Sequence, residues 1–133
     1  MKISFKPETA VNISSLILRL SSATMLTHGW KKLSNFSTMS EKFSDPLHVG
    51  HIASLSMTIF AEFFCTIFLV LGLFTRIATI PLIICFAVIV LIVHAPDDFS
   101  EKELGLVYLM LYIAIFILGP GKFSLDNAIR KVK

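Results

Sequence analysis

Residues 52–93 read IASLSMTIFAEFFCTIFLVLGLFTRIATIPLIICFAVIVLIV, and this stretch decides the fold. Glu62 and Arg76 are its only charged residues. A helix needs about 20 apolar residues to cross a hydrocarbon core of ~30 Å, so the stretch is long enough for two crossings. Thr75-Arg76 leaves room for only a tight turn between them. We therefore expect two antiparallel membrane-spanning helices, at about 52–74 and 77–94.

Two further apolar segments flank this hairpin, at about 11–28 and 103–119. Arg19 interrupts the first one, and no small-x-small cleavage site precedes His28, so we expect a retained span rather than a signal peptide. The 133 residues are 55% hydrophobic and 16% charged, against about 25% charged in soluble domains. The sequence therefore predicts an all-α integral membrane protein in which residues 1–133 form one antiparallel four-helix bundle.

Loop charges predict the orientation of the spans. With four spans, both termini lie on the same side as Arg76, and that side carries Lys2, Lys6, Arg76, Lys122, Arg130, Lys131 and Lys133. The opposite side carries fewer basic residues, namely Lys31, Lys32, Lys42 and Lys102. Basic residues concentrate in cytoplasmic loops, so both termini are expected in the cytoplasm. The net charge of +3 is not gathered into a nucleic-acid-binding motif, and no nucleic-acid partner is predicted.

Each of the first two predicted spans contains one charge. Arg19 lies nine residues before His28, and Glu62 lies about ten residues into the second span. At ~1.5 Å per residue both are roughly 14–16 Å below the outer surface. A charge near the middle of a span costs ~2.5–3.5 kcal/mol and is normally paired or functional. We therefore predict an Arg19–Glu62 ion pair, which either joins two helices or holds a ligand.

The residues around Glu62 form a polar stripe. Thr58, Glu62, Cys65 and Thr66 recur at helical spacing and suit either close helix packing or the wall of a polar cavity. Cys65 and Cys85 are expected at similar depths across the hairpin. They are either inert packing residues or a redox pair. No C-x-x-C spacing supports a disulfide framework or a zinc site.

A second group of polar residues lies at the predicted outer helix ends: His28, His51, His94 and Glu103. They either converge on one pocket, where histidines bind metal or pass protons to a quinone, or cap helices in water. Tyr108 and Tyr112 share one face of the fourth span, where buried hydroxyls need partners. Gly119-Pro120-Gly121 should end that span, after which Ser124 caps a short interfacial helix reaching Arg130.

Taken in order, these residues resemble the DoxX family of small bacterial membrane proteins. The resemblance rests on Arg19, on His28-Gly29-Trp30-Lys31-Lys32-Leu33, on Glu62, and on Gly72 to Arg76. It continues with His94, Glu103, and Gly119 to Asp126. It implies a four-helix bundle in the cytoplasmic (inner) membrane, associated with redox systems such as a thiosulfate:quinone oxidoreductase or thiol-redox partners. By match to the motif, Arg19, His28, Lys32, Glu62, His94 and Glu103 are implied as the site.

Three functions are compatible with these features, of which the third is a small carrier or proton pathway, although four short helices enclose little volume unless they oligomerise. The first is the membrane subunit of a quinone- or thiol-linked redox system, which binds a small ligand in an intramembrane polar pocket. Its catalytic residues would be His28, Glu62, His94 and Glu103, and its ligand-binding residues Arg19, Lys32, Glu62 and Tyr112, with no metal. No flavin or nucleotide motif is present, so an oxidoreductase activity would depend on a quinone or a soluble partner. The second function is a non-catalytic anchor that recruits a soluble oxidoreductase. Membrane lipid and a second copy of the chain are the other expected partners.

Overall fold

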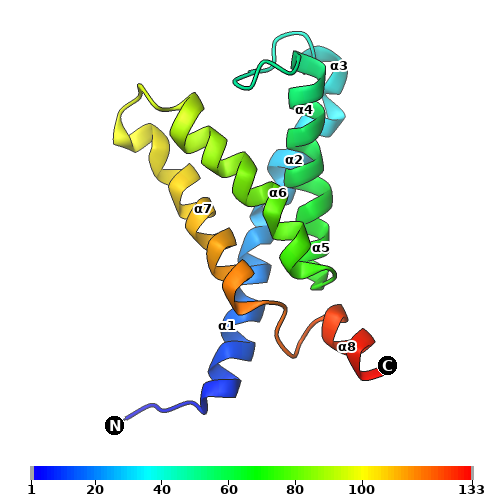
Figure 1. The fold of residues 1–133 in the computed structure, drawn as a ribbon, viewed down its shortest axis with the longest axis vertical. Helices are drawn as coiled ribbons and strands as arrows, with labels where there is room; N and C mark the ends of the chain where they lie inside the picture. The colour runs from blue at the N-terminus through cyan, green and yellow to red at the C-terminus, as the bar shows by residue number, and fades with distance from the viewer. Residues whose placement is uncertain (1, 133) are drawn as a thin grey trace.

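The computed structural model describes residues 2–132, and within them it contains helices, turns and loops but no strands (Figure 1). The predicted all-α class is confirmed. The first helical rod, residues 7–34, consists of α1 (Pro7–Ser21), the 3₁₀ turn η1 (Ser22–Thr24) and α2 (Met25–Ser34). The second, residues 51–71, consists of α4 (His51–Ile59), the π-helical turn η2 (Phe60–Cys65) and α5 (Thr66–Leu71).

The third rod, residues 75–93, joins α6 (Thr75–Val88) to a second π-helical turn, η3 (Ile89–Val93). The fourth rod is α7 (Phe99–Leu118). Two short helices lie outside the rods: α3 (Phe36–Met39) follows the first rod, and α8 (Leu125–Val132) follows the fourth. The second and third rods are long and apolar enough to cross a membrane, with mean hydropathies of 2.0 and 2.7. The predicted helical hairpin is present, but the tight turn lies at residues 72–74 rather than at Thr75-Arg76, which already belong to α6. The second rod therefore ends three residues earlier than predicted, at Leu71.

The first rod is longer than predicted. It was expected to end at residue 28, but helical structure continues through η1 and α2 to Ser34. The continuation is amphipathic: Met25 and Gly29 are buried, one turn apart, while Trp30 and Lys31 are exposed. This one-sided burial keeps the segment helical because it packs against the second rod. The rod therefore ends about two turns beyond His28.

The rods pack in two pairs that meet at one end of the molecule and diverge toward the other (Figure 1). α6 packs along α7, while α2 packs against η2 and α4. The buried core lies where the pairs meet, and its members are Met25, Ala61, Cys65, Leu69, Ala78, Leu82, Phe86, Tyr112 and Ile115. Tyr108 and Tyr112 stack with ring centroids 6.2 Å apart, which confirms that they share a face of α7.

The end of α7 is joined to the first rod by polar contacts. The helix stops at Leu118, as the Gly119-Pro120-Gly121 sequence predicts, and Gly119 takes a φ of 78° that favours glycine. The Ser15 hydroxyl donates to the Gly119 carbonyl over 2.7 Å, and the Lys122 amide donates to Asn12 Oδ1 over 2.9 Å. The chain leaving α7 is therefore held against α1.

α8 is attached to the turn between the second and third rods through Asp126. Its carboxylate accepts hydrogen bonds from the Phe74 amide (2.8 Å), the Thr75 amide (3.0 Å) and the Thr75 hydroxyl (2.9 Å). The Asp126 amide in turn donates to the Gly72 carbonyl. Ser124 caps α8 as predicted, since its hydroxyl accepts from the Asn127 amide. One carboxylate thus serves as the N-terminal cap of α6 and as the anchor of α8.

The attachment of α8 should depend on pH. Burial raises the pKa of Asp126, but the Thr75 and Phe74 hydrogen bonds and the nearby Arg19 charge outweigh it, so the pKa lies below its usual value. A lowered folded-state pKa adds stability above the unfolded value of ~3.9 and loses it as the pH falls through the folded value. We expect the Phe74 and Thr75 amides to be protected from hydrogen exchange at pH 6. The Asp126→Asn variant should lose this protection at pH 6, whereas Asp97→Asn, altered at an exposed carboxylate, should keep it.

Candidate functional site

A cavity of about 460 Å³ lies between the second and third rods, beneath residues 43–47. This volume is in the range of small-molecule sites, which are mostly apolar with a few placed polar groups. The wall fits that description. Its polar members are Lys32, Ser44, Ser54, Thr58, Glu62, Cys85 and His94, and its apolar members include Met57, Phe60, Ile84, Val88, Ile89 and Val93.

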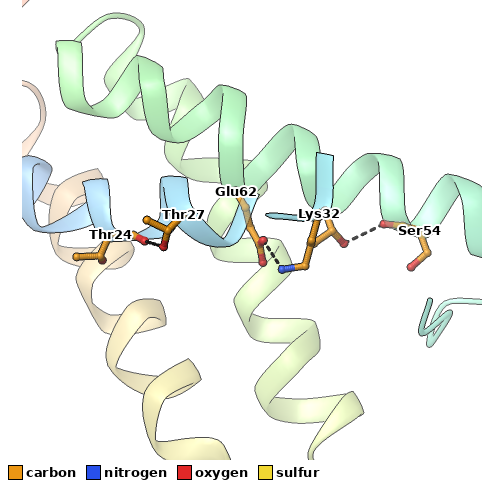
Figure 2. Close-up of polar contacts among 6 residues, drawn as sticks. Thr24, Thr27, Lys32, Ser54 and Glu62 are labelled. Carbon is orange, nitrogen blue, oxygen red and sulfur yellow. Dashed lines mark hydrogen bonds and ion pairs between the residues drawn. The ribbon is translucent and has the colours of Figure 1, made fainter. Parts of the chain in front are cut away.

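The wall of the cavity contains a partly buried ion pair between Lys32 of α2 and Glu62 of η2. Lys32 Nζ donates to Glu62 Oε2 over 2.6 Å, and Figure 2 shows the two side chains pointing toward each other from their helices. Glu62 is 5% exposed and Lys32 19% exposed at their side chains. A short, charge-assisted contact of this kind is strong because little water competes with it. Lys32 keeps further N–H donors in addition to the one given to Glu62.

Gly29 brings these two charges together. A Cβ atom at this position would lie 2.8 Å from the Phe63 Cβ and 2.8 Å from the Phe63 backbone nitrogen. The helices therefore cross with their backbones in close approach, an arrangement that small residues allow in membrane proteins. Lys32 follows Gly29 by three residues and so lies on the same helical face. The Gly-x-x-Lys spacing places the ammonium group beside Glu62.

Both walls of the cavity are formed partly by π-helical turns. Phe60 and Glu62 come from η2, while Ile89 and Val93 come from η3. The His94 amide donates to the Ile89 carbonyl over 3.0 Å, the i→i+5 bond that marks this geometry. Single π-helical turns occur frequently at functional sites. Here residues of both turns line the same cavity.

The predicted ion pair between Arg19 and Glu62 is wrong. The Arg19 guanidinium donates to the carbonyls of Val70 and Phe123, while Glu62 pairs with Lys32. The error came from the depth assigned to Arg19. Because the first rod continues to Ser34, Arg19 lies about 22 Å from its outer end at ~1.5 Å per residue. Arg19 is 1% exposed and joins the first rod to the segment that precedes α8, so its contacts are structural.

Three of the predicted site residues line the cavity: Lys32, Glu62 and His94. His94 Nδ1 lies 2.7 Å from Asp97 Oδ2 at the outer end of the third rod. The remaining candidates lie elsewhere. His28 and Glu103 are exposed and do not line the cavity, and His51 lies on a shallow surface next to Gly50. Of the four residues expected to meet in one pocket, His28, His51, His94 and Glu103, only His94 therefore lines this cavity.

Tyr112 lies in the protein core rather than on the cavity wall. It is fully buried, packs on Phe86 with centroids 5.5 Å apart, and its hydroxyl has no hydrogen-bond partner among residues 2–132. Tyr108 differs, because its hydroxyl lies 2.6 Å from the Thr24 hydroxyl. The packing interpretation of this tyrosine pair agrees with these positions.

The polar stripe around Glu62 is divided between two environments. Thr58 and Glu62 line the cavity, whereas Cys65 and Thr66 are buried in the core. The stripe was predicted for a uniform α-helix, and the π-helical geometry of η2 changes the angular relation between its residues. Cys65 and Cys85 are both free thiols, and Cys85 is the one on the cavity wall.

Sequence reasoning did not identify Ser54 or the covering segment 43–47. The Ser54 hydroxyl donates to the Ser44 carbonyl over 2.7 Å and holds that segment over the cavity. The backbone carbonyl of Ser54 also accepts from the Thr58 hydroxyl over 2.9 Å, and Figure 2 shows Ser54 on the same helix as Glu62. Extending the polar stripe back by one turn from Thr58 would have found Ser54. The covering segment has no comparable periodic signal.

Comparison with known proteins gives one match. A model of the DoxX family matches residues 14–95, which is more than half of the chain. The matched region contains Lys32, Glu62 and His94, the three predicted site residues on the cavity wall, and also Arg19. No curated protein and no solved structure matches the chain.

Proposed function

Because the chain belongs to the DoxX family, we propose that it is a membrane protein that binds a quinone in the cavity beside Lys32 and Glu62. The chain would then act as the membrane subunit of a redox system whose electrons come from a soluble oxidoreductase. One observation supports this most directly: a partly buried ion pair lies on the wall of a largely apolar cavity. A charged pair that only joined two helices would need no cavity beside it.

The residues present are compatible with a quinone ring. Its flat apolar body fits a wall formed by Met57, Phe60 and Ile84, and its carbonyl oxygens need hydrogen-bond donors. Lys32 supplies such donors within the cavity. A small sulfur-containing anion fits less well, because the wall is mainly apolar and Glu62 would repel it.

We assign different roles to the three polar residues. Lys32 donates a hydrogen bond to a carbonyl oxygen, and Glu62 holds Lys32 in position. His94, at the outer end of the cavity beside Asp97, exchanges protons with water. A bound quinone supplies two-electron, two-proton chemistry, with the electrons arriving from the soluble partner and the protons from water.

We also propose that all four rods cross the cytoplasmic membrane as a four-helix bundle, with both termini and α8 in the cytoplasm. The distribution of basic residues supports this orientation. The burial of Arg19, the one charge of the predicted first span, is compatible with a membrane crossing, because its guanidinium donates to the Val70 and Phe123 carbonyls instead of facing lipid. Protease access to Arg130 from the outside of intact cells would contradict it.

The proposal can be tested by measuring the binding of a decyl-substituted benzoquinone to the purified protein in lipid nanodiscs. Lys32→Met should weaken binding about 10- to 100-fold, since a hydrogen bond from a charged donor contributes ~1.5–3 kcal/mol. Lys31→Met is the matched control. Lys31 is exposed and does not line the cavity, so its removal should change the affinity less than twofold.

The result also separates this function from a non-catalytic anchor. An anchor would leave the wild-type protein without quinone affinity, while the exposed basic residues of α8 would be needed to recruit the soluble enzyme. Equal affinities of the Lys32→Met and Lys31→Met variants would refute the assignment of the cavity.

A further inference from the structure

We infer that the ligand of this cavity is a lipid-dissolved molecule whose tail leaves sideways, through a gap between the second and third rods, into the bilayer. This inference rests on the proposed function and specifies the ligand class as long-tailed rather than water-soluble. The gap is defined by Met57 and Phe60 on one side and Ile84 on the other.

The exposure of these residues shows that the cavity is open at the gap. Met57, Phe60 and Ile84 line the cavity, yet they are 49%, 52% and 56% exposed. A side chain that both lines a cavity and is half exposed marks an opening in its wall. Leu47 of the covering segment meets the same criterion at 49% exposure, so the choice between the two openings rests on their depth and polarity. Figure 1 shows α4 and α6 diverging toward the end of the molecule that carries the loop after α3.

The opening lies at the depth of the hydrocarbon core. Phe60 is near the middle of the rod His51–Leu71, and Ile84 is in the middle of the rod Thr75–Val93. At ~1.5 Å per residue, each is about 14 Å from the nearer end of its rod. In a hydrocarbon layer of ~30 Å this is close to the midplane, where only apolar molecules are available to enter.

The polarity of the cavity matches an amphiphile in one orientation. The charged pair Lys32–Glu62 lies inside, while the residues at the gap are apolar. A polar ring would therefore lie against Lys32, and an apolar tail would pass between Met57 and Ile84 into lipid. An outward path for the tail would pass Leu47, where the covering segment is held by the Ser54–Ser44 hydrogen bond.

The test compares two benzoquinones with the same ring, one carrying a ten-carbon tail and one without a tail. Their affinities are measured for the full-length protein in lipid nanodiscs. Met57→Trp and Ile84→Trp each narrow the gap from a different rod. Ile77→Trp is the matched control, because Ile77 is 68% exposed on the same helix as Ile84 but does not line the cavity. Leu47→Trp obstructs the outward path instead.

We expect both gap variants to lose at least tenfold in affinity for the tailed quinone and less than threefold for the tail-less one, while Ile77→Trp and Leu47→Trp bind both like the wild type. Two gap variants are used so that the test still stands if one of them fails to fold.

Equal losses for both quinones, no loss in either gap variant, or a tail-selective loss in Leu47→Trp would overturn the inference. If the wild type binds neither quinone, the proposed function itself fails. If the wild type binds both and Lys32→Met alone weakens them, only the tail placement fails.

Discussion

The Lys32→Met variant is expected to lose about 1–3 kcal/mol of unfolding free energy, because it leaves the Glu62 carboxylate without its charged donor in a partly buried pair. Glu62 is 5% exposed, so its carboxylate would be left in the protein interior without the 2.6 Å contact from Lys32. Replacing Lys32 and Glu62 together by methionine removes both charges and leaves apolar side chains of similar length. The double variant should therefore recover most of the lost stability.

The measurement is the unfolding midpoint of each variant in detergent, followed by quinone binding. The double variant should fold like the wild type but bind the decyl quinone at least tenfold more weakly, because it lacks the charged donor that Lys32 provides on the cavity wall. Lys31→Met should match the wild type in both measurements. Finding the single and double variants equally destabilised would show that the pair stabilises the helix crossing itself. Recovery of stability together with full quinone affinity would remove Lys32 from the site.

The second large effect is expected at Gly29, where α2 crosses η2. Gly29→Ala places a Cβ atom 2.8 Å from the Phe63 backbone nitrogen and 2.9 Å from the Glu62 carbonyl carbon. Backbone atoms cannot relieve the clash by a rotamer change, as the end of a side chain can, so the two helices must separate. We expect a destabilisation of about 1–3 kcal/mol from this overpacking, and a larger one for Gly29→Leu. Separation would also lengthen the Lys32–Glu62 contact, so quinone binding should fall in parallel.

Gly105→Ala in α7 is the matched control. The Cβ atom it adds would meet the Cγ2 atom of Val90 at 3.0 Å, which is the end of a side chain rather than backbone. Alanine is also the better helix former by about 0.8–1 kcal/mol, so this variant should be neutral or slightly stabilised. Similar unfolding midpoints for Gly29→Ala and Gly105→Ala would show that the close crossing at Gly29 does not matter.

Several features of the site depended on tertiary contacts that the sequence does not encode locally. The depth argument for Arg19 assumed that the first rod ends at His28. Because Met25 and Gly29 pack against the second rod, the helix continues to Ser34. With this longer helix, Lys32 rather than Arg19 lies beside Glu62. A register between two helices depends on where each one ends, and the apolar pattern locates such ends only within a few residues.

The π-helical turns also changed which residues share a face, over a shorter stretch of chain. The stripe from Thr58 to Thr66 was predicted with a constant 3.6-residue period, and η2 interrupts that period at Glu62. As a result Thr58 and Glu62 face the cavity while Thr66 turns into the core. The convergence of histidines expected at the outer ends also depended on how far the rods diverge there, which no local pattern reports.

The amino-acid sequence by itself determined that the protein is helical, that a tight turn joins the second and third rods, that α7 breaks at Gly119 and that Ser124 caps α8. These features follow from apolar run length and from backbone chemistry within a few neighbouring residues. It also singled out Glu62 and His94, because titratable groups are rare in and near apolar segments, whereas Lys32 was implied by the resemblance to the DoxX family. Only the tertiary structure decided that Lys32 is the partner of Glu62 and that a cavity lies beside them. Both outcomes depend on how helices far apart in the chain slide and diverge, and small differences in side-chain packing control that arrangement.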